Sequence, residues 1–365
     1  MPGGLNLSQG FSVVPSGARS DFGTPEIGES RPGSGTTESL AYSSLIQNSH
    51  KIAIVIPTIG RHAELRRMLA SLARQSRLPE EVIIVDEDGS SRVLANDFAR
   101  LDIRVVVLPG SASAKRNAGI RAVGREATLV GFMDDDIVLE PAAIEAMAAF
   151  WEQADPGLGG ACCNYVNAPR GFGQGLKRLA IWNALGLYER TPGGVARSGF
   201  QARMEHLRET VYVRWLPSGA TFYPRKVLDQ FRFDEWFESY SYLEDLDFSY
   251  RIGKQRKLAV VAGARFFHYP SESGRPGPHL FGKKEVLNRL YFVSKHSELS
   301  RTLCCLALSI RTLMSVFLGL TRFDIGCFKR VAGNVAGALL ALKGKWEAAR
   351  DWEGERPADG TGSGQ

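Results

Sequence analysis

The middle of the chain alternates between short apolar runs and longer stretches whose apolar residues recur at helical spacing. The apolar runs cover residues 52–56, 82–85, 104–108 and 128–133. Helical spacing occurs between residues 65 and 72, 93 and 100, and 112 and 123. Strands that alternate with helices are typical of an α/β protein with a mostly parallel, Rossmann-like central sheet and helices on both faces.

Acidic residues stand at the ends of two of these predicted strands. Asp86 ends the second run, and Asp134, Asp135 and Asp136 end the fourth. The carboxyl ends of parallel strands meet at one edge of the sheet, where ligands bind. Adjacent carboxylates repel each other unless a cation lies among them, and Mg²⁺ commonly joins carboxylates to a substrate phosphate. The pattern therefore predicts a nucleotide-type pocket, while a solvated acidic turn is the alternative for the three aspartates alone.

The second half of the chain supplies further polar residues at predicted element ends. A helix is expected to begin near Glu244, which would bring Asp245 to its first turn and pair Asp247 with Arg251 at i, i+4. Carboxylates at a helix N-terminus are also favoured by the backbone dipole, so a purely structural role is the alternative. A predicted strand at 260–267 then ends at His268.

Several short motifs occur in an order that is informative as a set. They are Val55-Ile-Pro-Thr58, Arg61, the Ile-Ile-Val-Asp86 strand end, Ala114-Lys-Arg-Asn117-x-Gly119, Phe132-Met-Asp-Asp-Asp136 and Glu244-Asp245. Over residues 51–270 this order resembles the family 2 glycosyltransferases. The resemblance implies a GT-A fold, a nucleotide-sugar donor and a divalent metal, Mg²⁺ or Mn²⁺.

The resemblance also implies a role for each motif residue. The nucleobase and ribose site would be lined by Pro57, Thr58, Arg61 and Asp86, with Arg116 near the nucleotide. The same motifs imply Asp134 and Asp136 as an Asp-x-Asp pair, Asp135 near the ribose, Asp136 and His268 on the metal, and Asp245 as general base. One departure concerns the second strand end, where Asp86-Glu-Asp-Gly-Ser contains one residue more than the family's usual Asp-Asp-Gly-Ser. The base-binding geometry is therefore expected to differ.

Composition divides the chain of 365 residues into four parts. With 44% apolar residues the chain can bury a core for one large domain with extensions. Residues 1–49, rich in Gly, Ser, Pro and Thr, are predicted to be a disordered extension. We expect a GT-A domain over 50–280, a basic amphipathic helical region over 281–350 and a disordered tail over 351–365.

Charge is concentrated in the C-terminal third. Residues 251–350 contain 18 Lys and Arg against 5 Asp and Glu, whereas the whole chain has a formal charge of +6. Basic residues beside apolar helix faces predict a peripheral position on an anionic membrane surface. Arg311 in the middle of Leu303–Leu320 argues against a membrane span, and Val331–Leu342 is too short for one. Packing of these helices on the catalytic domain is the alternative, and no nucleic-acid partner is expected.

Cysteine usage and the N-terminus favour a cytoplasmic protein. The five cysteines include two adjacent pairs and form no Cys-x-x-Cys motif, which does not suit a disulfide framework. A basic segment followed by an apolar core, as in a secretory signal, is not found at the N-terminus. We expect a location on the cytoplasmic face of the membrane.

Together these features predict an inverting, metal-dependent glycosyltransferase. It would move a hexose from a nucleotide sugar to a saccharide or lipid-linked saccharide in cell-surface polysaccharide or glycoconjugate synthesis. A nucleotidyltransferase and a degenerate glycosyltransferase that serves as a membrane-bound scaffold are the alternatives.

Overall fold

A mixed sheet organises the chain in the computed structural model, which describes residues 50–168, 180–204, 206–238, 241–271 and 273–346. Over these residues the sheet has nine strands in the order β3-β2-β1-β4-β8-β6-β9-β5, with β7 paired to β9. The strands are β1 (Ile52–Pro57), β2 (Glu81–Asp86), β3 (Ile103–Val107), β4 (Leu129–Met133), β5 (Ile137–Leu139), β6 (Leu158–Tyr165), β7 (Val211–Val213), β8 (Ala220–Pro224) and β9 (Lys257–His268). The pairings make β1, β2, β3, β4, β6 and β9 parallel in direction, and β5, β7 and β8 run the opposite way.

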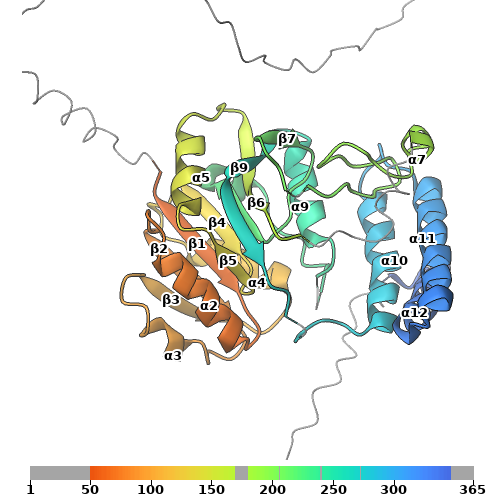
Figure 1. Cartoon of the computed structure of the whole chain (residues 1–365), viewed down its shortest axis with the longest axis horizontal. Helices are drawn as coiled ribbons and strands as arrows, with labels where there is room; N and C mark the ends of the chain where they lie inside the picture. The colour runs from red at the N-terminus through yellow and green to blue at the C-terminus, as the bar shows by residue number, and fades with distance from the viewer. Residues whose placement is uncertain (1–49, 169–179, 205, 239–240, 272, 347–365) are drawn as a thin grey trace, which may run out of the picture. The chain divides into compact units, whose positions relative to one another are not determined.

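Helices cover both faces of this sheet, as β1 illustrates. Every residue of β1 is buried, and successive side chains point to opposite faces. Ile54 belongs to the apolar cluster that contains residues of α2 (His62–Ala73) and α5 (Ala143–Glu152). Val55 belongs to the cluster with residues of α4 (Ala112–Ala122) and α9 (Glu244–Gly253). The predicted α/β fold class is confirmed (Figure 1).

The close contact of α4 with β1 explains a glycine of the motif around Asn117. A Cβ atom on Gly119 would overlap the side chain of Val55. Gly119 therefore lets the helix approach the strand, and this brings Lys115 and Arg116 to the carboxyl end of the sheet.

The sequence pattern did not predict β5, a short antiparallel strand in which Ile137 lies opposite His268. One local prediction was wrong. The helix expected over 93–100 is the shorter α3 (Arg92–Ala95), and turns with backbone hydrogen bonds between residues three apart follow it. The two short helices α7 (Ala180–Ala184) and α8 (Arg225–Gln230) complete the central region. The predicted disordered ends, 1–49 and 351–365, lie outside the described residues.

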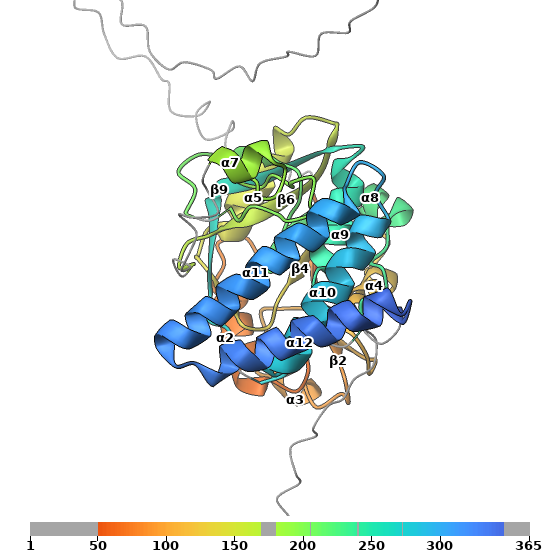
Figure 2. The ribbon, with the colours of Figure 1, turned by 90° about the vertical axis from the view of Figure 1, so that its right-hand side faces the viewer.

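Three helices follow the sheet. They are α10 (Pro278–Ser294), α11 (Arg301–Arg322) and α12 (Ile325–Leu342). Figures 1 and 2 show α11 and α12 on the side of α10 that faces away from the sheet. Side chains of α10 and of the first half of α11 belong to the apolar cluster on the α9 face of the sheet, and the Tyr188 hydroxyl donates to the Ala307 carbonyl oxygen of α11 at 3.1 Å. The C-terminal extension is therefore attached through both α10 and α11, and α12 packs on these two helices.

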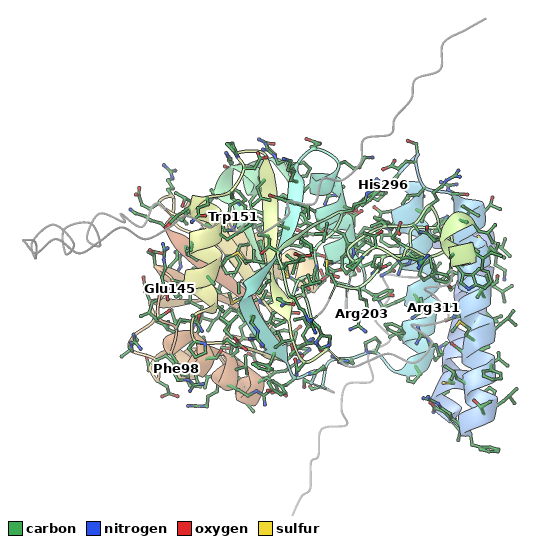
Figure 3. All side chains as sticks on the ribbon, turned by 45° about the horizontal axis from the view of Figure 1, so that its top comes forward. Phe98, Glu145, Trp151, Arg203, His296 and Arg311 are labelled. Atoms are coloured by element: carbon green, nitrogen blue, oxygen red, sulfur yellow. The ribbon has the colours of Figure 1, made fainter. Side chains whose placement is uncertain are left out.

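A buried carboxylate on α10 holds the three helices together. Glu285 is fully buried and forms ion pairs with Arg311 of α11 and Arg330 of α12. The Arg330 Nη2 atom lies 2.8 Å from the Glu285 Oε2 atom. Arg311, labelled in Figure 3, thus directs its charge towards α10. The arginine in the middle of α11 is therefore neutralised within the protein.

The outer two helices expose many large apolar side chains. Both α11 and α12 are long and apolar enough to cross a membrane by length and composition, and less than a third of each apolar window is buried. The prediction that the last helix is too short was wrong, because α12 begins at Ile325 and not at Val331. The exposed apolar residues of these helices and the turn between them are Leu306, Leu313, Phe317, Leu320, Phe323, Ile325, Phe328, Val335, Leu339 and Leu342.

We predict that Glu285→Gln destabilises the protein by ~2–3 kcal/mol, because two arginines then lack a countercharge. The value is below the range for fully buried pairs, since both arginine side chains are about a quarter exposed. Chemical denaturation measures the change. As a control, Glu126→Gln removes an exposed partner of Lys51 and should change stability by less than ~0.5 kcal/mol. Equal effects of the two substitutions would contradict the assignment.

Candidate active site

A cavity of about 1240 Å³ opens at the carboxyl ends of β1 and β4 and at the start of α9. This volume exceeds the ~300–1,000 Å³ of a usual small-molecule pocket, so it has room for more than one ligand. The predicted site residues in its wall are Pro57, Thr58, Arg61, Arg116, Asp134, Asp135, Asp136, Asp245 and His268.

Both carboxylate oxygens of Asp135 accept hydrogen bonds from the turn that follows β1. Its Oδ2 atom accepts a hydrogen bond of 2.7 Å from the Thr58 hydroxyl, and its Oδ1 atom accepts one of 3.0 Å from Arg61 Nη1. Burial raises the pKa of Asp135 to about 6, although the charge of Arg61 and the Thr58 hydrogen bond oppose the shift. Asp135 therefore positions Thr58 and Arg61 at the rim of the cavity.

Asp136 and His268 form a direct pair across β5 and β9. The Asp136 Oδ1 atom lies 2.8 Å from His268 Nε2, and the Asp136 Oδ2 atom accepts from the Ser271 amide at 3.2 Å. Burial opposes protonation of His268, but the hydrogen bond and charge of Asp136 outweigh it and raise the pKa of the imidazole. Burial likewise acts against the charged form of Asp136, yet His268 holds the pKa of this carboxyl below its usual value.

Within the described ranges, no group of three or more His, Cys, Asp or Glu side chains is arranged to hold a metal ion. The reason lies in the neighbouring contacts, since Asp135 is engaged by Thr58 and Arg61, and Asp134 by Arg116. Asp136 and His268 still offer one oxygen and one nitrogen donor side by side. Because a divalent ion bound to a diphosphate takes only one or two protein ligands, this donor set fits the metal that the fold family implies.

Arg116 joins the two halves of the cavity. Its Nη2 atom lies 2.9 Å from Asp134 at the end of β4, and its Nη1 atom lies 2.7 Å from Glu244 at the start of α9. Burial raises the pKa of Glu244 to about 8, with Arg116 acting in the opposite direction. Burial also raises the pKa of the adjacent Asp245. Leu243 just before them has φ of +76°, an unfavourable backbone for a leucine, which directs the chain into α9.

Asp86 does not lie where it was predicted. It is fully buried, and its oxygens accept hydrogen bonds from the Glu87 and Ser91 amides and from the Ser91 hydroxyl. Glu87, the next residue in the lengthened motif, lines the cavity instead. Asp86 therefore shapes the loop, and its neighbour provides the carboxylate at the rim.

Sequence reasoning also missed several residues of the wall. Lys115 is buried beside the cavity and donates a 2.7 Å hydrogen bond to the Thr58 carbonyl oxygen. Its place next to Arg116 in the motif was the available signal. Glu235, Trp236 and Arg275 line the cavity from loops that carry no periodic pattern.

We predict that Glu244→Gln flattens the pH dependence of stability in metal-free protein. A carboxyl with pKa about 8 when folded and about 4.5 when unfolded binds its proton more tightly in the folded state. The stability it confers is therefore complete below about pH 4.5 and is lost as pH rises towards about 8. Urea denaturation between pH 5 and pH 8 should show a smaller loss of stability with rising pH in the variant. Identical slopes in the variant and the parent would refute this, and Glu126→Gln is the control for loss of an exposed carboxylate.

Solved structures define the class of fold. The structure of Staphylococcus aureus TarS residues 1–349 in complex with UDP-GlcNAc superposes with a TM-score of 0.50 at 15% identity, covering 82% of this chain and 83% of that TarS 1–349 chain. This likeness shows a GT-A fold, as the resemblance implied.

Sequence comparison then gives the family. Residues 53–206 match Glycosyl transferase family 2. An uncharacterized glycosyltransferase of Bacillus subtilis, YwdF, is 37% identical over 108 residues, which are 29% of this chain and 40% of that protein. Validoxylamine A glucosyltransferase of Streptomyces hygroscopicus subsp. limoneus is 32% identical over 127 residues, 33% of this chain and 28% of that protein. The chain carries a family 2 glycosyltransferase domain. It spans less than half the length of these curated relatives.

Proposed function

We propose that the protein is an inverting, metal-dependent glycosyltransferase that uses a nucleotide-sugar donor. The observation that carries this proposal is the convergence of three groups on one cavity: the Thr58–Arg61 turn, the Asp136–His268 pair and Asp245. The first suits a nucleoside, the second a divalent ion and the third a general base. The similarity to a curated glucosyltransferase supports a hexose as the transferred group.

The donor binds in the half of the cavity formed by β1, β4 and β9. Thr58 and Arg61, fixed by Asp135, contact the nucleoside, and Lys115 adds positive charge beside them. Asp136 and His268 hold the divalent metal, Mg²⁺ or Mn²⁺, which when bound supplies charge neutralisation for the leaving nucleoside diphosphate. Arg116 keeps Asp134 in place at the end of β4.

Asp245 acts as general base in the other half. An acceptor hydroxyl gives its proton to the Asp245 carboxylate while its oxygen bonds to the anomeric carbon, and the bond from that carbon to the diphosphate oxygen breaks. Attack from the face opposite the leaving group inverts the anomeric centre. The raised pKa of Asp245 suits this role, because a more basic carboxylate takes up a proton more readily.

The exposed apolar face of α11 and α12 suits a membrane surface. The same helices and their ends also carry exposed basic side chains, namely Arg301, Arg322, Lys329, Lys343 and Lys345. An apolar face on helices that also carry basic side chains matches the headgroup region of an anionic bilayer. The Arg311–Glu285 pair favours a position in the plane of the surface, because a spanning α11 would separate these charges or carry α10 into the lipid. We propose a peripheral location on the cytoplasmic face and a saccharide or lipid-linked saccharide acceptor in cell-surface glycoconjugate synthesis.

Asp245→Asn is expected to retain nucleotide binding but to lower transfer by about 10²–10⁴-fold, because the acceptor proton loses its base. Release of nucleoside diphosphate is measured with a panel of sugar nucleotides, with membrane extract as the acceptor source. Asp229→Asn, which alters an exposed pair with Arg225, is the matched control and should transfer normally.

The same panel separates the alternatives. Normal transfer by Asp245→Asn would contradict the assignment of the base. Pyrophosphate release from nucleoside triphosphates would instead indicate a nucleotidyltransferase. Inactivity of the parent protein with every donor, together with retained binding to a partner protein, would favour the scaffold.

We further predict that the protein floats with anionic vesicles of phosphatidylglycerol and that Leu313→Asp combined with Phe317→Asp prevents this. Both side chains are at least 60% exposed on α11, so the substitutions should leave the fold intact. Val93→Asp changes an equally exposed apolar residue on α3 and serves as the control. Failure of the parent protein to float, or equal binding by the double variant, would exclude this surface as the membrane contact.

A further inference from the structure

The half of the cavity that faces the donor residues has a distinct chemical character. Its wall comes from the loop before α9 and from one neighbouring loop. The side chains that this inference uses are Gln201, Asp234, Glu235, Trp236, Glu238 and Tyr242. They combine two aromatic side chains, Trp236 and Tyr242, with several oxygen acceptors.

The indole of Trp236 is held in a fixed orientation. Tyr291 of α10 stacks on it with ring centroids 3.6 Å apart and planes 16° apart. The Tyr291 hydroxyl donates to Asp234 at 2.9 Å, and Lys295 Nζ donates to the same Asp234 oxygen at 2.6 Å. Tyr291 is behind the wall of the cavity, whereas Trp236 is part of it. The indole therefore presents its uncovered side to the cavity, where an apolar ring face can pack against it.

The polar side chains around this ring are also anchored. Asn117 of α4 donates to the Glu235 carboxylate at 2.8 Å and to the Phe233 carbonyl oxygen at 2.9 Å. Arg289 of α10 donates to the Gln201 side-chain oxygen at 2.6 Å. Carboxylate and amide groups fixed beside an aromatic ring match a sugar, which has apolar C–H faces and hydroxyl groups at its edges.

The charges on this side are negative. Asp234, Glu235, Glu238 and Asp245 line it, together with Glu244, whose pKa of about 8 leaves it largely protonated near neutral pH. Lys295 pairs with both Asp234 and the buried Asp247, so it does not cancel the negative charge of this wall.

The cationic side chains of the described wall lie with the donor residues or are already paired. They are Arg61, Lys115, Arg116, Arg275 and His268. A negatively charged acceptor would be repelled by the carboxylates in a partly desolvated cavity.

We propose that this half of the cavity is a subsite for an uncharged saccharide, which stacks on Trp236, hydrogen-bonds to Glu235, and is preferred over uronic acids and sugar phosphates. In a lipid-linked acceptor the phosphate then lies outside the cavity. This inference rests on the proposed glycosyltransferase function and specifies the class of acceptor.

The test compares the members of matched acceptor pairs. Each assay contains the full-length protein, Mn²⁺ and a sugar nucleotide that the protein has been found to cleave. Glucosides, galactosides, mannosides and N-acetylglucosaminides are each paired with the corresponding uronic acid or 6-phosphate. We expect kcat/KM to favour the neutral member of an accepted pair by at least about tenfold, and this preference to fall at high ionic strength. Equal use of both members, or preference for the anion, would overturn the proposal.

Variants identify the residues responsible. Glu235→Gln removes one negative charge without loss of volume and should reduce the preference for neutral acceptors severalfold, whereas Glu126→Gln should not change it. Trp236→Ala should raise the acceptor KM about tenfold, and Trp236→Phe should restore part of the affinity. An unchanged preference in Glu235→Gln together with an unchanged KM in Trp236→Ala would refute the subsite.

Measuring donor hydrolysis distinguishes failure of the subsite from failure of the proposed glycosyltransferase function. Nucleoside diphosphate release that no neutral glycoside increases would overturn the subsite and leave the glycosyltransferase proposal intact. Release from no donor under any condition would remove the proposed function, and the subsite with it.

Discussion

The buried guanidinium of Arg116 is the contact on which the geometry of the cavity depends. It ties Asp134, at the end of β4, to Glu244, at the start of α9, although more than a hundred residues separate these two in the sequence. Burying one cation between two carboxylates has a desolvation cost that ion pairing offsets only when the geometry is good. The two contacts, at 2.9 and 2.7 Å, meet that condition. As a result, the end of β4 that precedes the Asp136–His268 pair and the start of α9 that carries Asp245 keep a fixed separation.

Helix α10 provides the second constraint, because it supports from behind the loop that we propose as the acceptor side. Lys284 donates to the Glu238 carbonyl oxygen, and Asn288 donates to the Tyr242 carbonyl oxygen at 2.8 Å. Both acceptors belong to the loop that leads into α9. Polar residues are unusual inside a protein, and these are retained where a loop without regular structure needs hydrogen-bond partners. The shape of the proposed acceptor half is therefore set by a helix that contributes no described residue to the wall of the cavity.

The sequence predicted those parts of the protein that depend on local periodicity. Apolar runs followed by acidic residues are visible in the sequence itself. They predict the strand that ends at Asp86, the strand that ends just before Asp134 and the start of α9 at Glu244. Strand β5 was not predicted, because Ile137–Leu139 resembles the start of a helix until β9, far along the chain, pairs with it. Trp236 was missed for the same reason, since its role depends on Tyr291 and on no local pattern. Asp86 shows the converse, where one extra residue moved Glu87 into the position that the motif assigns to the aspartate.

The position of α10 also relates the acceptor half to the apolar face of α11 and α12. On one side α10 holds the loop of Glu238 and Tyr242, and on the other its Glu285 binds Arg311 and Arg330. A protein held at a bilayer by its outer helices would therefore hold the acceptor half in a fixed relation to the lipid surface. An uncharged sugar could then occupy the cavity while its anionic lipid phosphate stays near the basic side chains of α11 and α12. The negative charge of the cavity and the positive charge of the helices would thus select different parts of one lipid-linked substrate.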